Sequence, residues 1–393
     1  MTAGRGDPGA TPLTDRVLAP DLARGGMLLL IALANVTVWR YAQPVGVRGY
    51  PSDPQGADQV VTMLQLALVD GRAYPMFGLL FGYGVVQLAR RRAAVGLPAP
   101  AVVSVVRRRG GWLLLIGVVH AVLLFPGDIV GAYGLLGILL AGVLVRGSDS
   151  ALIAIGVVGI TVSTLFGAAV AFIGTAKTLV LPSTAVADPV AALVARAAGY
   201  LGGGLIAATL TVTGAAALGA WGARRGLLDD PQRHHGLLVR LAVVGIGAAA
   251  LGGLPLALVG GGLWTPSVGV VALLGCLHAA AGYAGGVGYA ALFGLLALRV
   301  GRRGGVGPVG SAVQACGQRS LSCYLAQSVA YAALLPAWTL GLGAQLRSGS
   351  AALLAVGVWL VILLVAAVSA RLGVRGPAEA VLRRLTYGRA RTP

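Results

Sequence analysis

Charged residues are scarce in this sequence, and acidic residues are scarcer than basic ones. Only 11% of its 393 residues are charged, whereas soluble domains usually contain about 25%. Hydrophobic residues make up 57% of the chain, and the mean hydropathy is +0.85. This composition excludes an ordinary soluble domain. It predicts an all-α integral membrane protein whose main partner is the lipid bilayer.

Several residue types that carry enzyme chemistry are nearly absent. Glu379 is the only glutamate, so the carboxylate pair of a glycosidase would have to come from aspartates, and no such pair stands out. The 3 cysteines and 4 histidines show no metal-ligand spacing. The G-x-S-x-G, H-E-x-x-H and P-loop motifs are also missing. We therefore expect no metal site and no bound cofactor.

Positive charge, by contrast, is plentiful. The formal net charge is +18, and arginine supplies nearly all of it because Lys177 is the only lysine. The arginines cluster between apolar runs, which is typical of the cytoplasmic loops of membrane proteins. We interpret the charge as a sign of topology and expect no nucleic-acid partner.

Apolar segments long enough to cross a bilayer recur along the chain, since a span needs roughly 20 residues. The second of them contains charged residues and a proline, which predicts a broken or re-entrant segment. The ten candidate spans are residues 22–39, 59–88, 110–126, 129–146, 151–175, 198–221, 237–259, 269–298, 318–340 and 350–371.

The basic residues indicate how these spans are oriented. With an inside N-terminus and alternating spans, 24 of the 30 basic residues fall in segments on the cytoplasmic side. We therefore predict about ten transmembrane helices with both termini in the cytoplasm. Residues 1–20 are expected to form a flexible tail, residues 21–371 the transmembrane domain, and residues 372–393 a basic tail.

Two ionisable residues interrupt the apolar stretch GVVHAVLLFPGDIVGAYGLLG, residues 117–137. His120 lies about ten residues past an arginine cluster, hence about 15 Å into the membrane at 1.5 Å per residue. It could act as a general base, or it could be a neutral histidine bonded to another helix. Asp128 follows a Pro-Gly break, which favours an N-cap for the next helix over a role in orienting a histidine or an acceptor.

Further polar residues mark the first two spans and the ninth. Asp21 and Arg24 open the first span, either as cap and interfacial cation or as an anion site. Asn35, about three turns later, should be hydrogen-bonded to another helix. We expect Asp70 to pair with Arg72 at the outer end of the second span. The ninth span adds Tyr324 and Gln327 to the set of candidate binding residues.

Six segments together resemble the YeiB-type family of bacterial membrane proteins, known as domain of unknown function 418. They are PDLARGGMLLLIALANV, YPMFGLLFGYGVVQLARRR, GVVHAVLLFPGDIVGAYGLLG, ALGAWGARRGLLDDPQRHHGLLVRLA, GQRSLSCYLAQSV and RGPAEAVLRRLTYG. They occur in the family's order between about residues 13 and 389. The resemblance implies a multi-pass protein of the bacterial plasma membrane.

This family is distantly similar to the transmembrane acyltransferase superfamily, which implies ten or so helices, a cytoplasmic donor resembling acyl-CoA and an acceptor at the outer side. The sugar acyltransferases of that superfamily carry a catalytic histidine eleven residues after the arginine of the first span. In this sequence that position is Asn35, so His120 or His278 would have to replace the base.

We therefore expect a membrane-embedded acyltransferase. The resemblance would make Arg24 a donor-binding residue, His120 the base and Asp128 its orienting partner, with Asn35 or Tyr324 stabilising the oxyanion. The donor would be a co-substrate and the acceptor a small molecule, sugar or lipid. Two alternatives remain open: a transporter or exporter of a small metabolite or lipid, with Asp70 and Arg72 lining its path, and an enzyme acting on an isoprenoid or lipid intermediate. The oligomeric state is not predicted.

Overall fold

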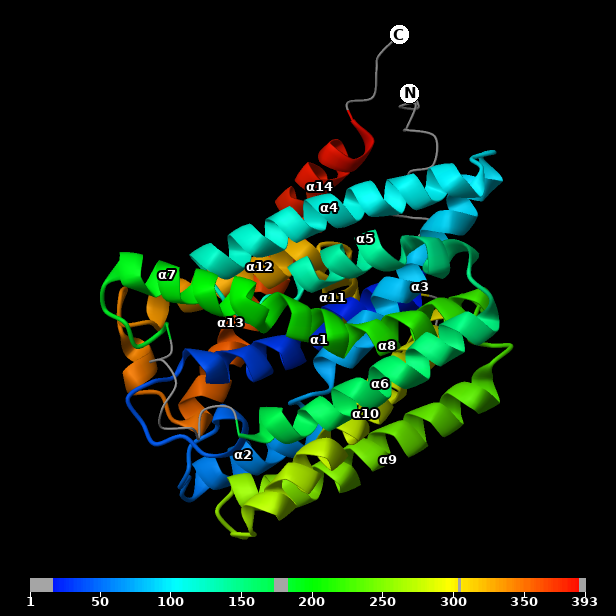
Figure 1. The fold of residues 1–393 in the computed structure, drawn as a ribbon. Helices are drawn as coiled ribbons and strands as arrows, with labels where there is room; N and C mark the ends of the chain where they lie inside the picture. Colours follow the sequence, from blue (N-terminus) through cyan, green and yellow to red (C-terminus); the bar gives the residue numbers. More distant parts are fainter. Residues whose placement is uncertain (1–16, 173–182, 303–304, 389–393) are drawn as a thin grey trace.

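The computed structural model describes residues 17–172, 183–302 and 305–388, and these residues form an all-helical bundle (Figure 1). Residues 173–175 of the fifth predicted span and most of the predicted N-terminal tail lie outside the described residues. The helices are α1 (Leu18–Asn35), α2 (Ala57–Leu68), α3 (Ala73–Ala94), α4 (Ala99–Leu123), α5 (Val130–Arg146), α6 (Asp149–Ala171), α7 (Pro189–Gly199), α8 (Leu205–Arg224), α9 (His235–Gly260), α10 (Val268–Arg302), α11 (Pro308–Gln318), α12 (Ser320–Leu334), α13 (Ser348–Arg371) and α14 (Pro377–Tyr387).

Six helical segments in the described part of the chain are long and apolar enough to cross a membrane. They match six of the ten predicted spans and confirm a membrane-like helical fold. The segments are Leu18–Trp39, Asp149–Ala171, Pro189–Arg224, His235–Gly260, Val268–Arg302 and Ser348–Arg371.

The other four predicted spans correspond to helices that are broken, short or rich in arginine. The second is broken, as expected, into α2 and α3 by a turn over residues 69–72. Helix α4 carries Arg107, Arg108 and Arg109 along its own length, and α5 and α12 have 17 and 15 residues. None of these four segments forms a single helix with about 20 consecutive apolar residues.

The two ends of the chain differ from the tails that the sequence predicts. Helix α1 already begins at Leu18, three residues before the expected start of the transmembrane domain. The predicted C-terminal tail contains α14, which packs against α4 and α12 (Figure 1). Leu382 and Thr386 of this helix are buried, so α14 is part of the folded protein.

Helices α4 and α5 form an antiparallel hairpin whose backbones almost touch. A Cβ atom on Gly134 of α5 would lie 2.2 Å from the amide nitrogen of Leu114 on α4. A Cβ on Gly117 would lie 2.0 Å from the amide nitrogen of Gly131. Glycine is therefore needed at these positions for the close approach. The hairpin brings the end of α4 next to the residues that begin α5.

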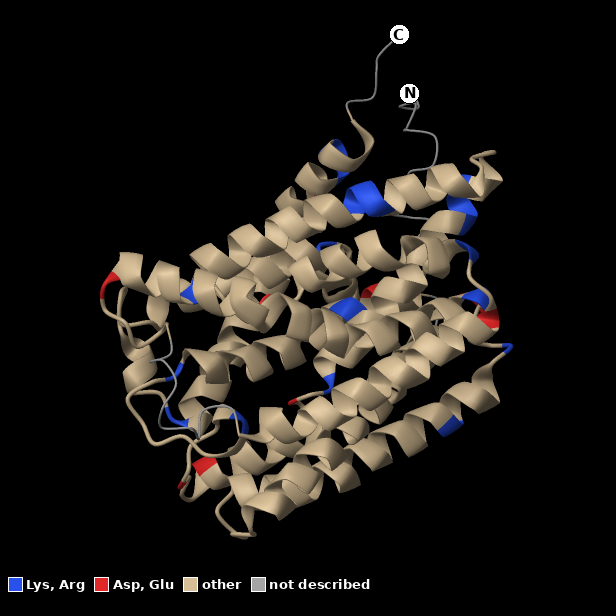
Figure 2. Ribbon diagram, in the orientation of Figure 1, with Lys and Arg blue, Asp and Glu red and all other residues tan. Residues whose placement is uncertain are grey.

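Many charged residues lie in the loops and at the helix ends, and others lie within the bundle and along α4 (Figure 2). At one end, Arg90 pairs with Asp229 at 3.4 Å, and Arg225 pairs with Asp149 at 2.9 Å. The first pair joins α3 to the loop after α8, and the second joins the end of α8 to the start of α6. We refer to this end, formed by residues 90–98, 146–149 and 224–234, as the arginine-rich end.

Candidate functional site

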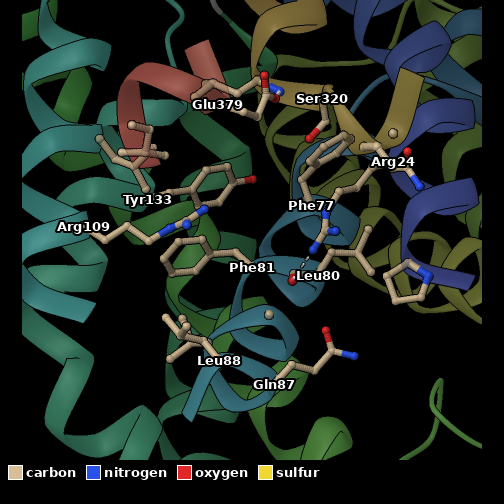
Figure 3. Close-up of a pocket in the computed structure, with 18 of the residues that line it drawn as sticks. Arg24, Phe77, Leu80, Phe81, Gln87, Leu88, Arg109, Tyr133, Ser320 and Glu379 are labelled. Carbon is tan, nitrogen blue, oxygen red and sulfur yellow. Dashed lines mark hydrogen bonds between the residues drawn. The ribbon is translucent and has the colours of Figure 1, made fainter. Parts of the chain in front are cut away.

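A cavity of about 600 Å³ lies between α1, α3, α4, α5, α11, α12 and α14. On α3 its wall extends from Phe77 to Arg92, a distance of about 22 Å at the rise of an α-helix. Arg24 and Arg109 reach into it from opposite walls, with aromatic side chains between them (Figure 3). The cavity therefore extends along most of α3 and reaches the arginine-rich end.

The lining of this cavity is strongly basic. Its described lining includes eight arginines and only three carboxylates. The arginines are Arg24, Arg90, Arg91, Arg92, Arg109, Arg319, Arg375 and Arg383. One of the carboxylates, Asp229, already pairs with Arg90. The excess of positive charge would attract an anion such as a phosphate.

The inner part of the cavity is apolar and aromatic. It is lined by Leu28, Ile31, Phe77, Phe81, Leu113, Ile129, Val130, Tyr133 and Tyr324. The rings of Phe81 and Tyr133 stack with centroids 5.1 Å apart. A basic mouth above an apolar interior is suited to a ligand with an anionic head and an apolar tail.

His120 and Asp128 form a buried hydrogen-bonded pair near the inner end of the cavity. His120 Nδ1 lies 2.7 Å from Asp128 Oδ2, and the two side chains are 2% and 0% exposed. A carboxylate oxygen accepts, so Nδ1 carries the proton and donates it. The tight α4–α5 hairpin positions the pair, because His120 lies in the last turn of α4 and Asp128 precedes α5.

The other carboxylate oxygen of Asp128 also has partners. It accepts from the backbone N–H of Gly131, in the first turn of α5, at 2.7 Å. The N-cap position of α5 is Ile129, however, one residue later than the sequence predicts. The same oxygen also accepts from the hydroxyl of Tyr200 at 3.1 Å. Asp128 therefore bonds both to the first turn of α5 and to a histidine.

The second ring nitrogen of His120 is left without a hydrogen-bond partner among the described residues. Nε2 is buried, and in the neutral ring with the proton on Nδ1 it presents a lone pair. The ring of Tyr324 lies next to it, with centroids 5.2 Å apart. An unsatisfied buried nitrogen is costly and uncommon in folded proteins, and it is a recognised feature of catalytic groups.

The pair and the cavity adjoin each other without being continuous. Ile129 and Val130, which line the cavity, directly follow Asp128 in the chain. Tyr324 lines the cavity on one side and contacts the ring of His120 on the other. His120 itself is not a lining residue. The tyrosine ring thus lies between the cavity and the ring of His120.

The candidate residues of the first and ninth spans are distributed around the cavity. Asp21 and Arg24 line it and lie 3.6 Å apart, and Arg24 also donates to the carbonyl of Leu80. Gln327 is buried just behind the wall and donates to the carbonyl of Leu28 at 2.9 Å. Asn35 ends α1 and is not among the lining residues, so the structure does not bring it to this site.

Asp70 and Arg72 belong to a separate buried cluster, and they do not form the ion pair with each other that the sequence predicts. The carboxylate of Asp70 pairs instead with Arg48, including a 3.1 Å bond from Nη2 to Oδ1. Arg72 donates to the backbone carbonyl of Asp70, to the carbonyl of Ala249 at 2.8 Å and to His278 Nε2 at 2.9 Å. The turn between α2 and α3 directs the two neighbouring side chains to different partners.

Arg48 reaches Asp70 from the loop between α1 and α2. Its backbone has a φ of +53°, which is strained for a residue with a side chain. Burial opposes the charge of Arg48, but the Asp70 carboxylate outweighs burial and raises the pKa of the guanidinium above its ordinary value. His278, the alternative base, lies in this cluster and is absent from the lining of the cavity.

Two important residues were not identified from the sequence. Tyr200 lies in a glycine-rich segment without a recognisable motif, and only the fold brings it to Asp128, 72 positions earlier. Arg48 lies in a polar loop, where an arginine normally faces solvent. No local pattern marks either residue, because both contacts join segments that are distant along the chain.

The family described as Protein of unknown function (DUF418) matches residues 222–389. The match includes α9 to α14, and therefore Arg319, Tyr324 and Glu379 of the cavity wall, but not His120, Asp128 or Tyr200. A comparison with curated proteins finds no match. The C-terminal part of the chain, residues 222–389, is therefore similar to the DUF418, or YeiB-type, family.

Proposed function

We propose that the protein is a membrane-embedded acyltransferase that uses a donor resembling acyl-CoA. The observation that carries the proposal is the buried His120–Asp128 pair beside the apolar end of a cavity with a basic mouth. A donor of this class has a phosphate-rich head and a thioester at the end of a long arm. The acceptor is a small molecule, sugar or lipid.

The cavity supports this donor in shape and in charge. Its length of about 22 Å along α3 suits an extended arm, and Arg90, Arg91 and Arg92 at the arginine-rich end would bind the phosphate groups. A thioester bound in this way would lie near Tyr324, whose ring contacts His120. Rotation of that ring would join the cavity to His120 Nε2. Asp21 and Arg24 would bind the donor's head from the first helix.

The chemistry assigned to the pair is general base and acid catalysis. His120 Nε2 takes the proton from the acceptor's hydroxyl or amine as its oxygen or nitrogen attacks the thioester carbonyl. The imidazolium that forms is stabilised by the Asp128 carboxylate. When the tetrahedral intermediate collapses, the carbon–sulfur bond breaks and the imidazolium protonates the leaving thiolate. Tyr324 would donate a hydrogen bond from its hydroxyl to the oxyanion.

The orientation that we propose puts the arginine-rich end and both termini in the cytoplasm of a bacterium, with ten spans in all. In a variant without native cysteines, Gln232→Cys at the arginine-rich end should react with an impermeant maleimide only after the cells are opened. Thr265→Cys, in the loop between α9 and α10, should react in intact cells. The reverse pattern would contradict the orientation.

The function is tested with purified protein in proteoliposomes, supplied with radiolabelled acyl-CoA and a panel of hydroxyl and amine acceptors. We expect acyl transfer by the wild type and a loss of about 10²–10⁴-fold in kcat for His120→Gln. His235→Gln is the matched control, because His235 is exposed at the start of α9. Full activity of the His120 variant, with both proteins folded, would rule out the proposed base.

A transporter of a small metabolite or lipid is the second candidate. The observation that favours it is the break between α2 and α3, where Arg48, Asp70, Arg72 and His278 meet inside the bundle. Broken helices and buried charges are typical of transport sites. Movement of an intact substrate across the proteoliposome membrane, without covalent change, would favour this function over acyl transfer.

A further inference from the structure

We propose that Tyr200 is a positioning residue that orients the Asp128 carboxylate and thereby keeps the proton of His120 on Nδ1. Tyr200 lies in a glycine-rich turn, and movement of this turn would change its contact with Asp128. This inference rests on the proposed acyl transfer, because it gives His120 the role of base. It concerns a part of the chain outside the DUF418 match.

The contact itself is well defined. Tyr200 is fully buried, and its hydroxyl donates to Asp128 Oδ1 at 3.1 Å. The N–H of Gly131 donates to the same oxygen, and His120 Nδ1 donates to the other. An ionised carboxylate can be buried only if donors replace its lost hydration. Tyr200 supplies one of the three donors, and the only one that comes from a side chain outside the α4–α5 hairpin.

The consequence for His120 is a fixed tautomer. Asp128 is held by Gly131 and Tyr200 on one oxygen, so its second oxygen faces His120 Nδ1 in a constant direction. A histidine whose Nδ1–H points at a carboxylate presents Nε2 as the acceptor. Without Tyr200, Asp128 keeps its Gly131 bond but can rotate about it, and the two tautomers of His120 become closer in energy.

The turn that carries Tyr200 has glycines with no packing role. Residues Tyr200–Gly204 form a π-helical turn that joins α7 to α8. A Cβ atom on Gly199, Gly202 or Gly203 would meet no other atom within 4 Å. Small size is therefore not needed there, whereas glycine does give the backbone more freedom than any other residue. Turns of this kind recur at functional sites.

Helix α7 connects this turn to the end of α4. Arg196 donates from Nε to the carbonyl of Val122 at 2.8 Å, and its guanidinium lies 4.9 Å from the ring centre of Trp338. Val122 is two residues after His120. A shift of α7 would therefore move Tyr200 and the end of α4 together, which couples the glycine turn to the catalytic pair.

Gly131 provides a second way to disturb the contact. A Cβ atom at this position would lie 2.2 Å from the Tyr200 hydroxyl and 3.3 Å from Asp128 Oδ1. Gly131→Ala would therefore push the tyrosine hydroxyl away without removing a polar group. Two substitutions on different helices, one of a donor and one of a glycine, should then have the same effect on His120.

The test is nitrogen-15 NMR of the full chain in nanodiscs with labelled histidine. The sequence has only 4 histidines, so single His→Gln variants assign their signals. The wild type should show His120 as one tautomer, with Nδ1 protonated and Nε2 bare. In Tyr200→Phe and in Gly131→Ala, we expect the two His120 nitrogen signals to shift toward each other by at least a quarter of their wild-type separation.

Two control variants separate this effect from a loss of stability. Tyr331→Phe removes a buried tyrosine bond of the same 3.1 Å length, to the carbonyl of Ala32. Gly137→Ala adds a methyl group to α5 where the nearest atom is 3.4 Å away. Both should leave the His120 signals unchanged. Unchanged His120 signals in folded Tyr200→Phe would overturn the proposal.

Kinetic measurements on Tyr200→Phe distinguish the positioning role from acyl transfer itself. Tyr200→Phe should lower kcat by about tenfold and leave the KM for the donor unchanged, because the donor cavity does not include Tyr200. A tautomer change in a protein that transfers no acyl group would support the positioning role and reject acyl transfer. If Tyr200→Phe transfers acyl groups with an unchanged kcat and an unchanged His120 tautomer, acyl transfer would be supported and the positioning role rejected.

Discussion

His120 Nδ1 lies 2.7 Å from Asp128 Oδ2, and both side chains are shielded from solvent inside an apolar hairpin. The cost of burying these groups is reduced because both carboxylate oxygens of Asp128 accept hydrogen bonds, from His120, Gly131 and Tyr200. His120 Nε2 has no such partner among the described residues, and the hydroxyls of Tyr133 and Tyr324 are also buried without one. The unsatisfied hydrogen-bonding capacity of this region therefore lies on one ring nitrogen and two tyrosine hydroxyls.

Asp128→Asn should reduce activity strongly while keeping the fold. The amide oxygen can still accept from Gly131 and Tyr200, but the amide nitrogen then faces His120 Nδ1 and forces the proton to Nε2. The base is thereby lost, and we expect kcat in the proteoliposome assay to fall by about 10²–10⁴-fold. Equal activity of this variant and the wild type would contradict the role of the pair.

The sequence predicts the separate roles of His120 and Asp128 better than it predicts the contact between them. A Pro-Gly break followed by Asp128 indicates a turn and a cap, and a histidine in an apolar helix indicates a polar contact. The closeness of the two residues depends on the Gly117 and Gly134 contacts, which bring α4 and α5 together. Glycine is so common in this chain, with 62 residues, that no single one stands out in the sequence.

The partners of Asp70 illustrate a different limit. The sequence correctly places a break in the second span, since charge and proline both disfavour a continuous apolar helix. It also suggests the nearest opposite charge, Arg72, as the partner. The structure uses Arg48 from a distant loop, because the turn points Arg72 toward Ala249 and His278. Proximity along the chain was a poor guide where the backbone turns.

The closeness of α4 and α5 can be tested by adding one methyl group. Gly134→Ala would place a Cβ 2.2 Å from the Leu114 nitrogen, which the hairpin can accommodate only by separating, so we expect a loss of about 1–3 kcal/mol. Gly111→Ala on α4 is the control, because a Cβ there meets nothing within 4 Å. That control should be neutral or slightly stabilising. The midpoints of thermal unfolding in detergent give the comparison, and equal midpoints would argue against close packing.

The Arg48–Asp70 pair, whose side chains are 11% and 16% exposed, should be more sensitive than a surface pair. Asp70→Asn leaves the largely buried Arg48 without its counter-charge, which should cost about 3 kcal/mol. Arg347→Gln is the control, since Arg347 is 79% exposed and 4.0 Å from Asp58, and it should cost less than about 1 kcal/mol. Similar unfolding temperatures for the two variants would show that the cluster is not stabilising.

The attachment of α14 to the cavity wall should depend on Glu379. One oxygen of this carboxylate accepts from the backbone N–H of Leu321 at 2.7 Å and from that of Ser322 at 3.3 Å, at the start of α12. A negative charge at a helix N-terminus is favourable. Glu379→Gln removes the charge and should weaken the attachment by about 1 kcal/mol, which would be measured as roughly fivefold faster amide exchange across residues 377–387.

Arg384→Gln is the matched control for this experiment, because Arg384 is exposed on the same helix. It should leave the exchange rates unchanged. The other end of α14 is held separately, since the Arg92 guanidinium lies 4.6 Å from the ring centre of Tyr387. Faster exchange should therefore begin near Glu379 and be smaller near Tyr387. Uniform or unchanged exchange in the Glu379 variant would show that packing of Leu382 and Thr386, and not the carboxylate, holds the helix in place.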